Sequence, residues 1–240
     1  MISEAAIWHD LECGSYQADL DSWRKLADQY SGPILDIGAG NGRVALMLAE
    51  LGHEVAALEL DRSLVATLAE RSGQLGIETI CADARDFQLD RAFGLIIVPM
   101  LTVQLFGGAE GRARFFACAA NHLSPNGCLA LAIADLLDDE EGASGGEQLD
   151  ADTCTVGASS YSTRATALRE RDGQIGIERR REITTADGSV VVQAATDWID
   201  PTTADQLEAE GTATGLTVAG RLQIPATAEY VGSVVVCLNG

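Results

Sequence analysis

Residues 34–43 read ILDIGAGNGR, a segment whose residue types could hold a nucleotide-like ligand. A run with a buried-strand pattern is followed by glycines at positions 38, 40 and 42, and then by helical spacing. Glycine lets the backbone turn sharply and approach a ligand closely. The amides of such a loop lie at the start of a helix, where partial positive charge gathers. The segment therefore predicts a ligand site.

Two charged residues indicate which ligand this loop would take. The dinucleotide fingerprint GxGxxG requires a third glycine at position 43, which is Arg43. That fingerprint would also place the carboxylate of Asp36 close to a pyrophosphate, an unfavourable pairing. S-adenosylmethionine has no phosphate and carries an ammonium and a sulfonium, so a carboxylate suits it. The charges favour S-adenosylmethionine over a dinucleotide.

The loop belongs to a chain in which short apolar runs alternate with helical patterns. Repeated strand–helix units with near-continuous apolar strands predict an α/β fold with a parallel sheet covered on both faces. The predicted strands are 33–37, 54–60, 78–81, 95–98, 128–134, 216–222 and 229–238, and the predicted helices are 41–51, 64–75, 111–123 and 202–214.

A second pattern interrupts these units after the fifth strand. Residues 136–152 are rich in Asp, Glu, Gly and Ser and predict an exposed loop. Three extended runs follow, over 153–170, 174–184 and 190–199, joined by Asp-Gly pairs that favour tight hairpin turns. We therefore expect an inserted antiparallel β subdomain over 136–199. Residues 1–135 and 200–240 would form the main domain, with an N-terminal lid segment over 1–30.

Three segments together resemble the class I S-adenosylmethionine-dependent methyltransferases. Residues 36–42 (DIGAGNG) resemble the acidic glycine loop of that family, 57–61 (ALELD) its second-strand segment, and 81–84 (CADA) the segment after its third strand. The resemblance covers about residues 17–135 and 202–238. It implies a doubly wound, mostly parallel seven-stranded sheet of Rossmann-like type, closed by a reversed hairpin.

The resemblance also implies a cofactor site for S-adenosylmethionine. In it, Glu59 would take the ribose hydroxyls and Asp83 would face the adenine amino group. The alternatives are that Glu59 is a solvated charge at a strand end and that Asp83 caps the following turn. The full set of cofactor-binding residues expected is Tyr16, Asp36, Gly38, Ala39, Gly40, Asn41, Arg43, Glu59, Leu60, Asp83, Ala84, Val98 and Pro99.

Composition limits the partners of such an enzyme. The 240 residues include 16 Lys and Arg against 36 Asp and Glu, a formal charge of −20. That field repels phosphate backbones and anionic membranes, so neither nucleic acid nor a membrane is expected as a partner. The six cysteines show no CxxC spacing, which favours reduced thiols in a cytoplasmic protein. No stretch approaches the roughly 20 apolar residues of a membrane span, and the N-terminus has no secretory pattern.

The residues at the end of the fourth strand limit the kinds of methyl acceptor that we expect. Residues 98–101 read VPML, without the [DN]PP[YF] signature of enzymes that methylate nucleic-acid bases or glutamine amides, and without an acidic residue. We expect direct, metal-independent methyl transfer to an amine or hydroxyl of a small molecule. The sequence from His9 to Trp23 resembles the start of small-molecule N-methyltransferases, although that family usually has Tyr where His9 stands.

Three residues are candidates for catalysis, namely Tyr16, His9 and Asp135. Asp135 ends the fifth strand, and the resemblance places the N-terminal segment over the same opening. In the alternative interpretation Asp135 caps a turn, His9 is solvated and Tyr16 only packs against the cofactor. Two other histidines are not assigned a role: His53 is interpreted as part of an exposed connection and His122 as a solvated helix end.

The inserted runs carry the main basic cluster of this acidic chain. Its members are Arg164, Arg169, Arg171, Arg179, Arg180 and Arg181. They could form salt bridges with neighbouring carboxylates or recognise an anionic acceptor, and the meander itself could pair two subunits of a homodimer. Two other kinds of protein remain open: a catalytically inactive S-adenosylmethionine-binding or regulatory protein, and an NAD(P)-dependent oxidoreductase.

Overall fold

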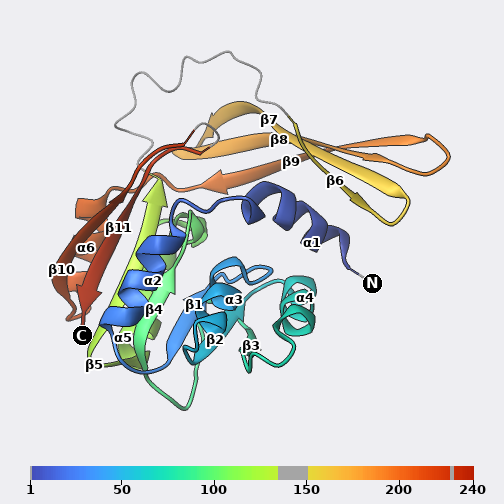
Figure 1. Ribbon diagram of the computed structural model, residues 1–240. Coiled ribbons are helices and arrows are strands. Elements are labelled where there is room, and N and C mark those ends of the chain that lie inside the picture. The colour runs from blue at the N-terminus through green and yellow to red at the C-terminus, as the bar shows by residue number, and fades with distance from the viewer. Residues whose placement is uncertain (1, 135–150, 228–229) are drawn as a thin grey trace.

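The computed structural model describes residues 2–134, 151–227 and 230–240, and these form two sheets (Figure 1). The main sheet has seven strands in the order β10-β11-β5-β4-β1-β2-β3, with β1 to β5 parallel and β11 antiparallel to both of its neighbours. The predicted fold class is confirmed. The strands are β1 (Ile34–Ile37), β2 (Val55–Glu59), β3 (Glu78–Cys81), β4 (Phe93–Val98), β5 (Leu123–Ala134), β10 (Thr217–Ile224) and β11 (Ser233–Asn239).

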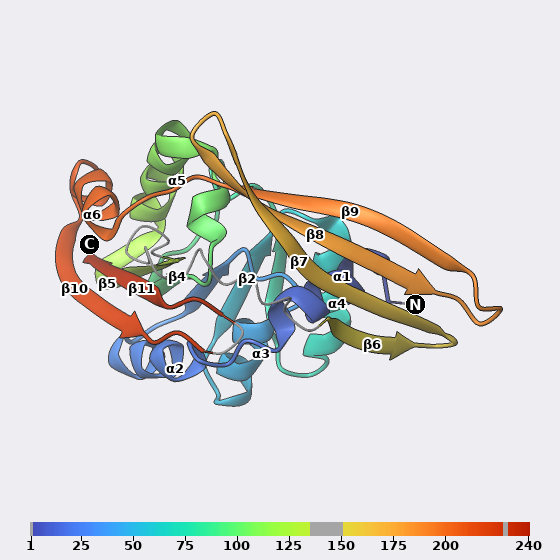
Figure 2. The ribbon, with the colours of Figure 1, turned by 90° about the horizontal axis from the view of Figure 1, so that it is seen from above.

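Helices cover both faces of the main sheet, as Figure 2 shows from above. Because successive strand residues point to opposite faces, Ile34 of β1 packs with α2, α3 and α4 while Leu35 packs with α5 and α6. None of the described helices is long and apolar enough to cross a membrane. The helices are α2 (Leu20–Gln29), α3 (Arg43–Glu50), α4 (Arg62–Ser72), α5 (Gly108–His122) and α6 (Ala204–Thr212).

The second sheet, called here the roof sheet, is an antiparallel meander of four strands. They are β6 (Asp152–Val156), β7 (Ser159–Arg171), β8 (Gln174–Thr184) and β9 (Val190–Ile199). The single run predicted over 153–170 is wrong, because the chain reverses within it and Val156 pairs with Ser159. Gly157, with φ of 63°, supplies the left-handed residue of that turn. The turn predicted at Asp172 and Gly173 forms with φ of 53° and 81°.

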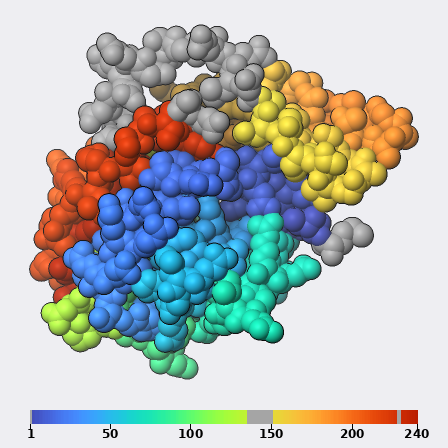
Figure 3. Space-filling view, in the orientation of Figure 1, coloured from blue at the N-terminus to red at the C-terminus, as the bar shows by residue number. Residues whose placement is uncertain are grey.

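The N-terminal segment lies between the two sheets (Figures 1 and 3). It contains α1 (Glu4–His9) and a π-helical turn, η1 (Asp10–Gly14), and extends to Asp19, the residue before α2. Ile7, Trp8 and Leu11 are buried and pack against roof residues that include Tyr161, whose ring is 5.3 Å from that of Trp8. The roof sheet therefore rests on the N-terminal segment.

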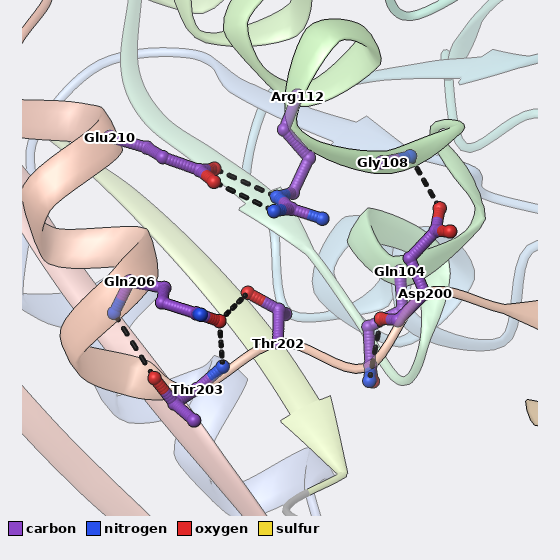
Figure 4. Close-up of polar contacts among 8 residues, drawn as sticks. All are labelled: Gln104, Gly108, Arg112, Asp200, Thr202, Thr203, Gln206 and Glu210. Carbon is purple, nitrogen blue, oxygen red and sulfur yellow. Dashed lines mark hydrogen bonds and ion pairs between the residues drawn. The ribbon is translucent and has the colours of Figure 1, made fainter. Parts of the chain in front are cut away.

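A set of polar contacts fixes the return of the chain from the roof sheet to α6 (Figure 4). Asp200, just after β9, donates its N–H to Gln104 O at 2.8 Å and accepts from the N–H of Gly108. Gln104 lies in η2 (Thr102–Leu105), the 3-10 turn that follows β4. Arg112 of α5, which is 5% exposed, forms two hydrogen bonds of 2.7 Å to Glu210 of α6. The contacts of Asp200 tie the end of the roof sheet to η2 and α5, and the ion pair joins α5 to α6.

The pair of Arg112 and Glu210 gives a stability prediction. Glu210→Gln should lower the free energy of unfolding by about 1–3 kcal/mol, because part of a buried guanidinium loses its charged partner. Glu208→Gln, on the same helix, is the matched control. Its partner Arg221 is 37% exposed, so a change below about 1 kcal/mol is expected. Urea denaturation of both variants tests this, and equal losses would contradict it.

Candidate functional site

The predicted ligand loop lies at the carboxyl end of β1, where the strand order reverses between β1 and β4. Ligands of open α/β sheets bind at such a point. Gly38 and Gly40 have φ of 67° and 55°. A Cβ on Gly38 would lie 2.4 Å from Thr102 Cγ2, and one on Gly40 would lie 2.1 Å from His9 Nε2. Both positions therefore require glycine for two reasons, the backbone angle and the close neighbour.

Asp36 is a buried carboxyl just before this loop. It is 1% exposed, and its Oδ1 has no hydrogen-bond partner among the described residues. Burial raises the pKa of Asp36 to about 7, although nearby Arg43 opposes the rise. A buried carboxyl with a free oxygen is costly unless it is paired. The site therefore fits a ligand that brings a cationic donor, as S-adenosylmethionine would.

Glu59 ends β2 beside the glycine loop. Its Oε2 accepts the N–H of Gly40 at 3.0 Å and its Oε1 accepts the N–H of Asp61 at 2.9 Å. The next residue, Leu60, is 63% exposed. This geometry holds the carboxylate at the edge of the glycine loop. Its role toward a ribose stays a prediction.

Asp83 follows β3 and already has a protein partner. It accepts the backbone N–H of Arg85 at 2.8 Å and forms an ion pair with the guanidinium of Arg85 at 2.7 Å. These bonds hold the pKa of Asp83 below its usual value. Ala84 is buried in the core. The turn-capping alternative thus describes the contacts of Asp83, and its contact with an adenine stays a prediction.

The end of β4 lies beside the end of β1, next to the glycine loop. Val98 and Pro99 are buried, and the following residue, Met100, has φ of 56°. A bulky residue rarely adopts this left-handed conformation, and such strain concentrates at functional sites. Thr102, which touches Gly38, begins η2 two residues later. Sequence patterns alone did not indicate Met100 or Thr102.

Two predicted cofactor residues bind the N-terminal segment instead of facing outward. Asn41 donates through Nδ2 to Ala6 O at 2.7 Å and to Asp10 Oδ1 at 3.0 Å. Arg43 donates to Tyr16 O at 2.8 Å and forms two bonds, of 2.6 and 2.7 Å, to the buried Asp19. The glycine loop and the N-terminal segment are therefore one connected structure.

Two of the three candidate catalytic residues lie at this junction, and Asp135 lies outside the described residues. His9 packs on Gly40, and burial lowers its pKa, which leaves the imidazole neutral near pH 7. Its Nδ1 has no hydrogen-bond partner among the described residues. The ring of Tyr16 lies 4.7 Å from that of Tyr230, tilted by 46°. Both tyrosines line a cavity of about 430 Å³.

The roof sheet faces this junction through a charged cluster that involves Glu12 of η1. Glu12, which no sequence pattern indicated, accepts two bonds of 2.7 Å from Arg181 and one of 2.9 Å from Thr163. Arg169 pairs with Glu178 at 3.0 Å, Arg180 pairs with Glu182, and Arg171 lies 3.9 Å above the ring of Trp198.

Within the described ranges no group of three or more His, Cys, Asp or Glu could hold a metal.

Comparison with known families and proteins agrees with the geometry. A family model described as a methyltransferase domain matches residues 34–127. Two curated relatives match over shorter stretches: the cypemycin N-terminal methyltransferase of a Streptomyces species, 28% identical over 102 residues, and an rRNA adenine N-6-methyltransferase of Corynebacterium diphtheriae, 34% identical over 64. These matches cover 42% and 27% of this chain, and 42% and 25% of those two proteins.

Solved structures show the same fold over nearly the whole chain. DesVI of Streptomyces venezuelae has a TM-score of 0.75 at 19% identity and covers 98% of both chains. The sugar N-methyltransferase KedS8 of a Streptoalloteichus species has a TM-score of 0.74 at 18% identity, over 98% of this chain and 93% of its own. The similarity includes the roof sheet, since no shorter match could reach this coverage.

Proposed function

We propose that this chain transfers the methyl group of S-adenosylmethionine to an amine nitrogen of a small molecule. A family model described as a methyltransferase domain matches residues 34–127, and the fold is that of solved methyltransferases. The observation that carries the proposal is the buried oxygen of Asp36, which has no hydrogen-bond partner among the described residues, beside a loop that requires glycine at positions 38 and 40. The carboxyl would bind a cationic group, and the glycine loop would let the ligand lie close to the backbone. The similarity to N-methyltransferases of sugars and peptides supports nitrogen as the acceptor atom.

In the proposed complex Asp36 holds the ammonium, the loop from Gly38 to Gly40 approaches the ligand with its backbone, and Glu59 binds the ribose. When bound, S-adenosylmethionine supplies an activated methyl group, so the chain's own task is positioning more than Lewis-acid activation. An acceptor amine reacts only when it is neutral. His9 and Tyr16 lie at the same junction, and we propose that they orient the amine or take its proton.

The function is tested by incubating the protein with S-adenosylmethionine and a panel of amino sugars, peptide amines, phenols and carboxylates. We expect S-adenosylhomocysteine to form only with an amine, and mass spectrometry to find one added methyl group on that amine. Cofactor binding without transfer to any compound would favour a binding or regulatory protein. Binding of a dinucleotide in place of S-adenosylmethionine would favour an oxidoreductase.

Glu59 gives a separate prediction for the cofactor site. Glu59→Ala should weaken S-adenosylmethionine binding by about 10- to 150-fold, the effect of losing roughly 1.5–3 kcal/mol of hydrogen bonds to a charged group. Glu54→Ala, just before the same strand, removes a carboxylate that is 67% exposed and pairs with Arg91. It should leave the affinity unchanged. Calorimetry on both variants is the measurement, and an unchanged affinity of Glu59→Ala would exclude the ribose role.

A further inference from the structure

The roof sheet turns two of its arginines toward the N-terminal segment. Because successive side chains of a strand point to opposite faces of the sheet, Arg179 and Arg181 of β8 lie on one face and Arg180 lies on the other. Both inward arginines approach Glu12 of η1, and Arg179 also approaches Asp197 of β9. Two cations and two carboxylates thus meet under the roof sheet of a chain whose net charge is −20.

The two arginines differ in the hydrogen bonds that they form. Arg181 donates to both oxygens of Glu12 at 2.7 Å, and Thr163 takes the remaining position on Oε1 at 2.9 Å. Arg179 Nε lies 4.0 Å from Glu12 and 3.7 Å from Asp197, beyond hydrogen-bond distance. Its buried Nε has no hydrogen-bond partner among the described residues. An unpaired buried donor of this kind is costly.

Arg179 also lies on the side of the roof sheet that is tied to the ligand loop. Its neighbour Asp197 is three residues before Asp200, which hydrogen-bonds to η2 at Gln104. Thr102 of the same η2 touches Gly38. The side chain of Arg179 is 21% exposed, so it is only partly covered by the surrounding protein.

We propose that Arg179 binds an anionic group, a carboxylate or a phosphate, carried by the acceptor amine. The inference rests on the proposed function and names the acceptor class that this function would use. A guanidinium presents several N–H donors in a planar fork that matches both kinds of anion. Arg181 already forms two hydrogen bonds to Glu12, whereas Arg179, the other of the two inward arginines, has an Nε without a hydrogen-bond partner among the described residues.

The experiment measures binding to protein saturated with S-adenosylhomocysteine, by calorimetry, with two matched pairs of amines. Glycine and glycinamide differ in a carboxylate, and glucosamine 6-phosphate and glucosamine differ in a phosphate. In at least one pair the anionic member should bind about 10- to 150-fold more tightly than the neutral one, the range for hydrogen bonds to a charged group. The pair that shows the preference identifies the anion.

Two variants assign that preference to Arg179. Arg179→Gln should abolish it and Arg179→Lys should retain part of it, because lysine keeps the charge but loses the fork. Arg180→Gln removes the same charge from the opposite face and should leave the preference intact. Equal binding within both pairs, or a preference that survives in Arg179→Gln, would overturn the proposal. Thermal unfolding of each variant shows whether the fold is kept.

Methyl transfer to the same four amines separates this inference from the function on which it rests. Anion binding that depends on Arg179, without transfer to any amine of the wider panel, would refute the proposed function and leave Arg179 as an anion site. Transfer to neutral amines as fast as to their anionic partners would leave the function standing and refute the acceptor class.

Discussion

Asp36→Asn is expected to weaken S-adenosylmethionine binding by more than about 100-fold, since a buried charge pair that loses one partner costs roughly 3 kcal/mol or more. The carboxyl is 1% exposed and one of its oxygens has no partner among the described residues, so little solvent screens the interaction. Asparagine has nearly the same shape, so the change removes the charge and keeps the packing. Asp90→Asn, at an exposed position, is the control and should leave binding unchanged.

The same carboxyl predicts how stability depends on pH when no ligand is bound. Burial raises the pKa of Asp36 to about 7, whereas the unfolded chain releases this proton near pH 4, the ordinary value for aspartate. The group's contribution to stability is therefore complete below about pH 4 and is lost as the pH rises through about 7. Asp36→Asn should flatten that part of the profile and be at least as stable as the wild type at pH 8.

Binding of the cationic cofactor should show the opposite dependence. The cation prefers the ionised carboxyl, so affinity should fall as the pH drops below about 7, approaching tenfold per pH unit. Calorimetry between pH 5.5 and 8, on the wild type and Asp36→Asn, tests both statements. A wild-type affinity that does not change with pH, or an Asp36→Asn affinity within threefold of wild type, would contradict the role given to Asp36.

The parts of the fold that were predictable have strong local patterns. β1, β2 and β4 are buried on both faces, so they read as continuous apolar runs, and Asp172-Gly173 is a favoured hairpin turn. The turn at Gly157 was missed because the pair Gly-Ala is a weaker turn signal than Asp-Gly. His122, expected at the surface, is instead 2% exposed. Its Nε2 accepts the N–H of Leu89 at 2.9 Å, so this buried ring nitrogen has a hydrogen-bond partner.

The candidate site also has a part that the sequence predicts and a part that it does not. The glycine loop with Asp36 and Glu59 could be predicted because the residue types and their spacing follow from the ligand. The use of Asn41 and Arg43 to hold the N-terminal segment could not be predicted, since it depends on the whole segment, with α1 and η1, lying over the loop. These short elements are placed by tertiary packing of Trp8 and its neighbours under the roof sheet. Glu12 acquires its role only there.

Gly40→Ala is expected to have the other large effect on the cofactor site. The new Cβ would lie 2.1 Å from His9 Nε2 and the residue would keep φ of 55°, so the loop or the N-terminal segment must shift. Because the cofactor is proposed to lie against this backbone, we expect affinity for S-adenosylmethionine to fall more than about 100-fold, as for misplaced binding groups. Gly52→Ala is the matched control, since Gly52 has φ of 93° but no neighbour within 4 Å.

Gly52→Ala should lower the free energy of unfolding by about 1–2 kcal/mol through backbone strain alone and leave cofactor affinity unchanged. The double variant His9→Ala, Gly40→Ala removes the neighbour that the new Cβ meets. We expect it to recover much of the free energy of unfolding lost in Gly40→Ala. It should recover little of the affinity for S-adenosylmethionine, because the new Cβ at position 40 still stands where the cofactor would approach the loop. If Gly40→Ala instead matched Gly52→Ala in both denaturation and calorimetry, neither the close neighbour His9 nor a close approach of the cofactor would explain the glycine at position 40.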